Sequence, residues 1–283
     1  MDAQQAQALN WRSWGAKVAK LSPESDEEVL DLIALGLIVS FTLAAMLLLG
    51  GITAPYGRYS RPGWGFMLPV RLAWCLQEAP TLATTAWGLA RADLSDSSAP
   101  IANPAARALL GCFVLHYFNR TVIFPLRVRG GKGTPLAPFL MALGYCCVNG
   151  YLQSHALIAT HIYPSGWVQQ PCFVCGVGLF LLGIGINYHS DSILRGLRKE
   201  GDVGGYKIPR GGMFEYVSGA NYFGEILEWG GFALAAWSLP ALSFALCTVL
   251  NLGPRALHHH AWYQEHFKGK YPSARKALIP FVL

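Results

Sequence analysis

Residues 187–228 read NYHSDSILRGLRKEGDVGGYKIPRGGMFEYVSGANYFGEILE. The stretch leaves one apolar segment, collects charged residues and paired glycines, and enters a second apolar segment that still carries Asn221, Glu225 and Glu228. A carboxylate or an amide inside a membrane-embedded segment is costly unless it faces a partner or a polar cavity. The stretch therefore predicts two membrane-embedded segments that hold something polar.

The composition of the whole chain also indicates a membrane protein. Of its 283 residues, 53% are hydrophobic and only 13% are charged, which is too apolar for an ordinary soluble domain of this length. The first apolar run begins near Val29 after a charged lead, and we expect it to be retained as a span rather than removed as a signal peptide. The net charge of +6 is spread over short loops, which argues against a nucleic-acid-binding patch.

Seven apolar runs are long enough to span a bilayer core, which requires about 20 residues of helix. They cover residues 29–50, 68–90, 105–126, 136–160, 171–187, 217–237 and 239–258. We therefore predict an all-α integral membrane protein with seven transmembrane helices. Residues 1–28 form an unassigned lead, and residues 29–283 form a single domain.

The distribution of Lys and Arg predicts the orientation, because these residues concentrate in cytoplasmic loops. The first, third and fifth loops and the C-terminal tail are basic, whereas the fourth and sixth loops contain no Lys or Arg. We expect the N-terminus outside and the C-terminus in the cytosol. The protein would be a multi-pass protein of the bacterial inner membrane, or of the endoplasmic reticulum if its source is eukaryotic.

Polar side chains recur on five of the seven predicted helices, mostly toward their cytosolic ends. They are Gln77 and Glu78; His116, Tyr117 and Arg120; Asn187, Asp191 and Arg198; Asn221, Glu225 and Glu228; and Arg255, His259, Tyr263 and His266. Residues four apart share a helix face, and an ionisable residue within a span costs at least about 2.5 kcal/mol. A single cavity open to the cytosol would satisfy all of these groups.

The charge beside this cavity suggests what fills it. Five cations approach from the same side, namely Arg58, Arg120, Arg198, Lys207 and Arg255. They suit a polyanion such as a dinucleotide pyrophosphate, and Asp191 and Glu225 could accept hydrogen bonds from its ribose hydroxyls or carboxamide. The sequence lacks a GxGxxG motif after a strand, a P-loop and a βαβ pattern, so helices would have to hold the nucleotide.

Simpler interpretations of the same residues remain open. Glu78, Arg120 or Glu225 could each be half of a structural ion pair that locks two helices together. Three consecutive histidines at 258–260 point in three directions on a helix, so we expect no metal site there. Helix packing is the expected role of the glycines and cysteines in apolar runs, including Gly176, Gly178, Gly183 and Gly185 and the lone C-x-x-C at 172–175.

Longer motifs make the interpretation more specific. They are NYHSDSILRxLR from Asn187, YKIPRGGMFEYVSGANYFGEILEW from Tyr206, RALHHHxWY from Arg255, YPSARKALIPF from Tyr271, WCLQExP from Trp74 and HYFNRT from His116. Over roughly residues 50–283 the chain resembles the steroid 5α-reductases. The Gln-Glu and His-Tyr motifs favour these enzymes over the polyprenol, enoyl-CoA and sterol reductases that share the C-terminal part.

The resemblance implies reduction of the C4=C5 double bond of 3-oxo-Δ4 steroids with NADPH. Glu78 and Tyr117 would hydrogen-bond the C3 carbonyl oxygen of the substrate, with Gln77 beside them. The NADPH site would be lined by Tyr56, Arg120, Asn187, Asp191, Arg198, Tyr206, Asn221, Glu225, Arg255, His259 and Tyr263, so residues 135–283 would carry most of it. Lys207 and Gly131 stand where these enzymes carry Arg.

The implied reaction is a conjugate reduction, in which negative charge builds on the carbonyl oxygen and a hydrogen-bond donor to that oxygen is needed. The expected partners are a steroid or sterol-like enone and membrane lipid, without nucleic acid or metal, and we expect a monomer. Two alternatives stay open. One is another enone-lipid reductase or an isoprenylcysteine-type methyltransferase of related fold, and the other is a non-enzymatic sterol-binding membrane protein.

Overall fold

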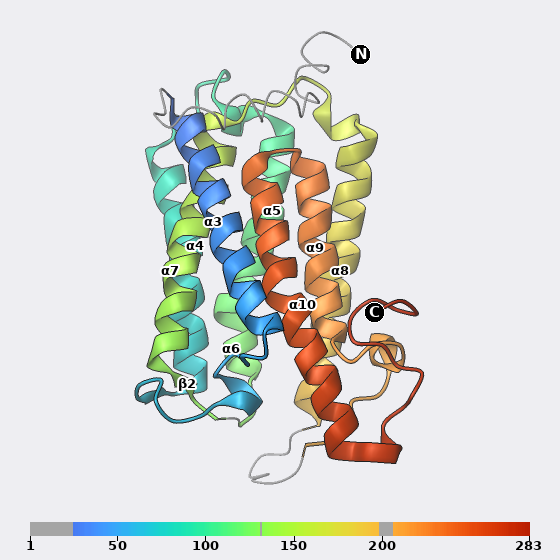
Figure 1. Ribbon diagram of the computed structural model, residues 1–283. Helices are drawn as coiled ribbons and strands as arrows, with labels where there is room; N and C mark the ends of the chain where they lie inside the picture. The colour runs from blue at the N-terminus through green and yellow to red at the C-terminus, as the bar shows by residue number, and fades with distance from the viewer. Residues whose placement is uncertain (1–24, 131, 198–205) are drawn as a thin grey trace.

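The computed structural model describes residues 25–130, 132–197 and 206–283, and in this part of the chain seven long helices run up and down in one bundle (Figure 1). They are α3 (Asp26–Leu49), α4 (Val70–Arg91), α5 (Pro104–Phe118), α7 (Leu136–His155), α8 (Pro171–Gly196), α9 (Ala220–Ala236) and α10 (Leu239–Phe267). A π-helical turn, η3 (Asn119–Ile123), joins α5 to the short helix α6 (Phe124–Arg127), and α7 ends in a second such turn, η4 (Ala156–Thr160).

The seven predicted helices are present, with two differences in extent. The fifth and seventh continue beyond their apolar runs, to Gly196 and Phe267. The all-α prediction also missed one small element, because strands β1 (Met67–Leu68) and β2 (Thr134–Pro135) pair antiparallel. Two residues are too few to give a strand a recognisable alternation of polar and apolar positions.

Side-chain caps fix where several helices begin. Ser25 precedes α3 and accepts a hydrogen bond from the Glu28 amide at 3.3 Å, and three acidic residues fill the first turn of α3, where the helix dipole favours negative charge. Asn103 caps α5 in the same way, accepting from the Ala105 amide at 2.9 Å. Ser238 begins α10 directly after α9, which makes these two helices a tight antiparallel pair.

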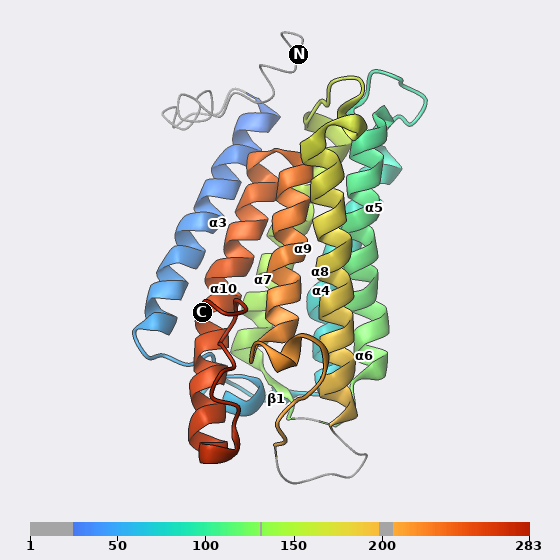
Figure 2. The same ribbon diagram turned by 90° about the vertical axis from the view of Figure 1, so that its right-hand side faces the viewer.

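Three helical segments in the described part of the chain are long and apolar enough to cross a membrane, namely Asp26–Leu49, Pro104–Arg127 and Pro171–Gly196. The connections that we predict to be cytosolic lie together at one end of the bundle, and the start of α3 lies at the other end (Figures 1 and 2). The structure thus shows a helical protein with membrane-capable helices, and its basic loops share one end.

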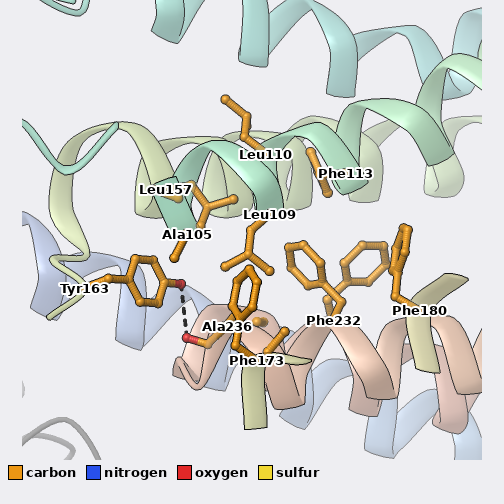
Figure 3. Packing of buried hydrophobic residues seen from close by; sticks show 14 of the residues in the cluster. Ala105, Leu109, Leu110, Phe113, Leu157, Tyr163, Phe173, Phe180, Phe232 and Ala236 are labelled. Carbon is orange, nitrogen blue, oxygen red and sulfur yellow. Dashed lines mark hydrogen bonds between the residues drawn. The ribbon is translucent and has the colours of Figure 1, made fainter. Parts of the chain in front are cut away.

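An aromatic and aliphatic core fills the bundle toward the end opposite the basic loops. The ring centroid of Phe113 on α5 lies 6.3 Å from those of Phe232 on α9 and Phe244 on α10. The Phe232 ring lies 6.3 Å from that of Phe180 on α8. The Tyr163 hydroxyl donates to the Ala236 carbonyl at 3.0 Å (Figure 3). This packing closes that end, so the polar side chains gather in the other half.

Helices α8 and α9 approach until their backbones touch, and four glycines make this possible. A Cβ atom at Gly176 would lie 2.5 Å from the Ala235 nitrogen, and one at Gly183 would lie 2.6 Å from the Gly224 carbonyl oxygen. On α9, a Cβ at Gly224 would lie 2.5 Å from the Asn187 nitrogen, and one at Gly231 would lie 2.5 Å from the Gly176 oxygen. Such distances are far below van der Waals contact, so no other residue fits without moving the helices.

The prediction that glycines allow close packing is therefore right for two of the four positions named. Nothing lies within 4 Å of a Cβ built at Gly178 or Gly185. These two glycines each follow a contact glycine by two residues, which is about 200° further around the helix, so they point away from α9.

Replacing Gly183 with Leu should separate α8 from α9 and lower the melting temperature of the purified protein. Overpacking costs roughly 1–3 kcal/mol in ordinary cores and more when only backbone faces the new side chain. Gly185→Leu, two residues away with open space, is the matched control and should melt like wild type. Equal melting temperatures for the two variants, measured in the same detergent, would show that the α8–α9 contact is not tightly packed.

Candidate functional site

A continuous polar network joins η3, α8 and α9 in the half of the bundle near the basic loops. The Nη1 atom of Arg120 lies 3.6 Å from Oδ2 of Asp191, and the Asn221 amide donates to Oδ1 of Asp191 at 3.3 Å. The Asn187 amide donates to the Asn221 carbonyl at 2.9 Å and to Oε2 of Glu225 at 3.5 Å. The structure thus brings together five of the residues that the resemblance assigned to the cofactor.

The polypeptide places these groups by two local devices. Gly224 lets the backbone of α9 touch that of α8 at Asn187, so the amide of Asn187 reaches across to α9. Arg120 stands in the π-helical turn η3, a distortion that is common at functional sites because it re-aims a side chain. Its guanidinium lies 4.6 Å above the Trp74 ring of α4.

A second group surrounds Arg255 on α10. Its Nη2 atom donates to the Tyr222 hydroxyl at 2.8 Å, and the guanidinium lies 4.6 Å above the ring of Tyr56. His259 packs 5.5 Å from the rings of both Tyr222 and Tyr59. Burial raises the pKa of Tyr56 to about 12, although Arg255 opposes the shift. Tyr56 therefore stays a neutral hydroxyl that can donate or accept a hydrogen bond.

A third group surrounds Arg58, which precedes α4. The guanidinium lies 5.0 Å from the ring of Tyr206, 4.4 Å from Trp262 and 4.6 Å from Tyr263. Its Nη2 atom donates to the Tyr263 hydroxyl at 3.0 Å, whereas Nη1 is buried without a hydrogen-bond partner. A buried guanidinium nitrogen without a partner is unfavourable, and an anion beside it would satisfy it.

The predicted substrate-binding residues form a fourth group. The Gln77 amide donates to Oε1 of Glu78 at 3.3 Å, and the Cys146 thiol of α7 donates to Oε2 at 3.5 Å. Tyr117 is buried, with its ring centroid 4.9 Å from that of Phe113, and Glu78 lies within electrostatic range of its hydroxyl. The two groups expected to hold the carbonyl oxygen therefore belong to one site.

Arg120 connects this fourth group to the polar network. Its guanidinium pairs with Asp191 at 3.6 Å and lies within electrostatic range of Glu225, Glu78 and Glu228. Arg255 interacts in turn with Glu225 and Arg120, which links the second group to the first. The arrangement is one extended polar site, walled by helices and the loop before α4.

Some predicted residues fall outside this site. Arg198 and Gly131 lie outside the described residues. Lys207 donates to the Leu197 carbonyl at 3.2 Å, and His266 stacks on Trp262 at 4.4 Å. Nδ1 of His116 lies 2.7 Å from Oε1 of Glu228, both buried, so these two residues form an interhelical pair of their own. Arg120 also forms an interhelical ion pair, with Asp191.

Sequence reasoning missed residues on α7 and beside known motifs. Asn149 and Gln153 are buried on α7. They lie four residues apart in an apolar run, and this spacing indicates a polar face on a sixth helix. Tyr222 follows Asn221 directly, and Trp74 opens the motif that contains Glu78, but neither aromatic residue could be assigned a partner from the sequence. Each was overlooked because aromatic residues in apolar runs usually serve packing alone.

Two other possibilities from the sequence can be compared with the structure. All seven cysteines are free thiols, so the C-x-x-C at 172–175 forms no disulfide. Among the described residues, no group of three or more His, Cys, Asp or Glu side chains is placed to hold a metal ion.

The paired glycines Gly211 and Gly212 both have positive φ, and a Cβ at Gly212 would meet His189 at 2.6 Å. This pair therefore has a packing use that the sequence did not suggest.

Comparison with known proteins places these observations in a family. The sequence profile described as 3-oxo-5-alpha-steroid 4-dehydrogenase matches residues 132–283. The chain is 51% identical over 236 residues to 3-oxo-5-alpha-steroid 4-dehydrogenase 1 of Rattus norvegicus, covering 83% of this chain and 88% of that protein. It is 51% identical over 215 residues to 3-oxo-5-alpha-steroid 4-dehydrogenase 2 of Homo sapiens, covering 76% and 82%.

A third relative extends the match over most of both sequences. It is 3-oxo-5-alpha-steroid 4-dehydrogenase 2 of Sus scrofa, which is 47% identical over 242 residues, covering 85% of this chain and 92% of that protein. Together with the profile match over more than half of the chain, these identities show that the chain belongs to the 3-oxo-5-alpha-steroid 4-dehydrogenase family.

Proposed function

We propose that this protein reduces the C4=C5 double bond of 3-oxo-Δ4 steroids with NADPH. The observation that carries the proposal is the single polar site, in which Arg120 links Glu78 to Asp191 and Glu225. The relatives are named 3-oxo-5-alpha-steroid 4-dehydrogenases, which are oxidoreductases that act on this class of steroid. A site with a carbonyl-binding part and a polyanion-binding part, joined by one cation, suits this pair of reactants.

The residues present fit NADPH. The buried, unpartnered Nη1 of Arg58 and the guanidinium of Arg255 would face its phosphates. The amides and carboxylates of the polar network would bind its ribose and carboxamide groups. The proposed cofactor-binding residues are Tyr56, Arg120, Asn187, Asp191, Arg198, Tyr206, Asn221, Glu225, Arg255, His259 and Tyr263. When bound, NADPH supplies the hydride.

The chain's own residues stabilise the charge that develops on the substrate. Tyr117 donates its hydroxyl hydrogen to the C3 carbonyl oxygen, where negative charge builds during the reduction of an enone. Glu78 donates to the same oxygen while it is protonated, and Gln77 and Cys146 hold its two carboxyl oxygens in place. The aromatic core around Tyr117 keeps water away from the reacting atoms.

In the membrane, we propose that all seven long helices span the bilayer as one domain, with the N-terminus outside and the C-terminus in the cytosol. The basic loops at one end of the bundle support this orientation. The chain would be a monomer in the bacterial inner membrane or the endoplasmic reticulum. A steroid is apolar enough to enter from the surrounding lipid, whereas NADPH enters from the cytosol.

The test of the function is to follow NADPH absorbance after a 3-oxo-Δ4 steroid is added to the reconstituted protein. We expect NADPH consumption together with a 5α-reduced product. Steroid binding without NADPH consumption would favour a sterol-binding protein, and binding of S-adenosylmethionine would favour a methyltransferase. Either result would overturn the proposal.

Glu78→Gln and Tyr117→Phe should each lower kcat by about tenfold or more, because Tyr117→Phe removes a donor to the developing oxyanion and Glu78→Gln replaces the carboxyl O–H with the weaker amide donor. The NADPH dissociation constant should stay nearly unchanged in both variants. Tyr151→Phe is the control, since Tyr151 stacks on His155 away from the site. Wild-type turnover in both Glu78→Gln and Tyr117→Phe would refute the roles assigned to these residues.

Asp191→Asn and Asn221→Ala should weaken NADPH binding by roughly 10- to 100-fold, which is the range expected for hydrogen bonds that involve a charged group. Fluorescence titration with NADPH measures the effect. Ser192→Ala, next to Asp191 but on the exposed side of α8, should bind NADPH like wild type. If the three variants have the same affinity, the cofactor lies elsewhere.

A further inference from the structure

Helix α7 carries a buried polar pair that the proposed reaction does not yet use. Asn149 is 0% exposed and Gln153 is 2% exposed, and the two lie four residues apart on one face. Cys146, one turn before Asn149, contacts Glu78. The face of α7 that bears Asn149 is therefore turned toward the substrate group.

One backbone carbonyl determines how the side-chain amides of Asn149 and Gln153 are oriented. The Pro240 carbonyl can only accept a hydrogen bond, so the Gln153 atom that lies 2.7 Å from it is the amide nitrogen. The same nitrogen donates to Asn149 at 3.1 Å, so the Asn149 atom that faces it is the oxygen Oδ1. The NH2 group of Asn149 must then point away from Gln153.

This NH2 group lies in the part of α7 that is turned toward the group of Glu78 and Tyr117, since Cys146, one turn before, donates to Glu78. The Asn149 donor also acts electrostatically on the Tyr117 hydroxyl. In the described part of the chain the Asn149 nitrogen is buried without a hydrogen-bond partner, so its donor remains available. Burying a donor without a partner is unfavourable, which is a reason to look for its function in the loaded site.

The backbone around Asn149 leaves little freedom to adjust. A Cβ atom at the next residue, Gly150, would lie 2.7 Å from the Cα atom of Thr81 on α4, and the Thr81 hydroxyl donates to the Cys146 carbonyl at 3.3 Å. Because α4 and α7 are locked at this level, the distance between Asn149 and the α4 residue Glu78 is also fixed.

We propose that Asn149, oriented by Gln153, is a positioning residue for Tyr117. Its NH2 group donates to the phenol oxygen, and this leaves the phenol's only hydrogen free to point at the substrate's carbonyl oxygen. A hydroxyl that accepts one hydrogen bond also becomes a stronger donor in the next one, because neighbouring hydrogen bonds polarise each other. The inference rests on the proposed function and extends it to α7.

A double-mutant cycle tests the inference, with kcat measured for Asn149→Leu, Tyr117→Phe and the pair. Asn149→Leu has a similar volume but no donor, and it should lower kcat by about tenfold while the NADPH dissociation constant is retained. In the Tyr117→Phe background the same substitution should have no further effect, because residues that act as a unit are not additive. Additive losses, or unchanged kcat in Asn149→Leu, would overturn the inference.

Two further variants distinguish the loss of this interaction from a folding defect. Gln153→Leu frees the Asn149 amide to rotate, and it should give a smaller loss of kcat that also disappears in the Tyr117→Phe background. Ser154→Ala is the matched control on α7, since Ser154 is buried but its hydroxyl donates only to carbonyls of its own helix. It should keep wild-type kcat. If Tyr117→Phe itself were fully active, the proposed function of Tyr117 would fail, and that outcome is distinct from failure of the Asn149 inference alone.

Discussion

The backbone contact between α8 and α9 is the constraint on which the site depends. Lipid offers no hydrophobic driving force between helices, so association relies on close van der Waals packing and on interhelical hydrogen bonds. Glycines at 176, 183, 224 and 231 provide the close approach. Because α8 and α9 touch, Asn187 can donate to the Asn221 carbonyl, and the polar network between these helices is a direct consequence of the packing.

The same device operates on the other side of the site. Gly150 of α7 meets Thr81 of α4, and this contact sets Cys146 beside Glu78. Arg120 pairs with Asp191 of α8, its guanidinium lies over Trp74 of α4, and it is within electrostatic range of Glu78 and Glu225. Burying a charge is costly unless it is paired and hydrogen-bonded, so a shared arginine satisfies several carboxylates that would otherwise each need their own partner.

The apolar core determines in which half of the bundle the polar site lies. Rings from α5, α8, α9 and α10 and the Tyr163 hydrogen bond close the end of the bundle away from the basic loops (Figure 3). The polar groups are left in the other half, near loops that carry Arg58 and Lys207. In the proposed function, a charged cofactor and an apolar substrate reach adjacent parts of one site from different phases.

The sequence by itself determined the helices, the end of the bundle where the polar groups gather, and most of the residues in the network. Apolar run length predicts helices, and spacing predicts which residues share a face, since both depend only on local geometry. The motifs around Glu78, Tyr117 and Asn187 were sufficient to suggest the family. Tertiary structure decided which face meets which helix. It separated Gly183 from Gly185, paired His116 with Glu228, and set Cys146 of α7 beside Glu78 of α4, because these contacts join residues that are distant in the chain and that no periodicity relates.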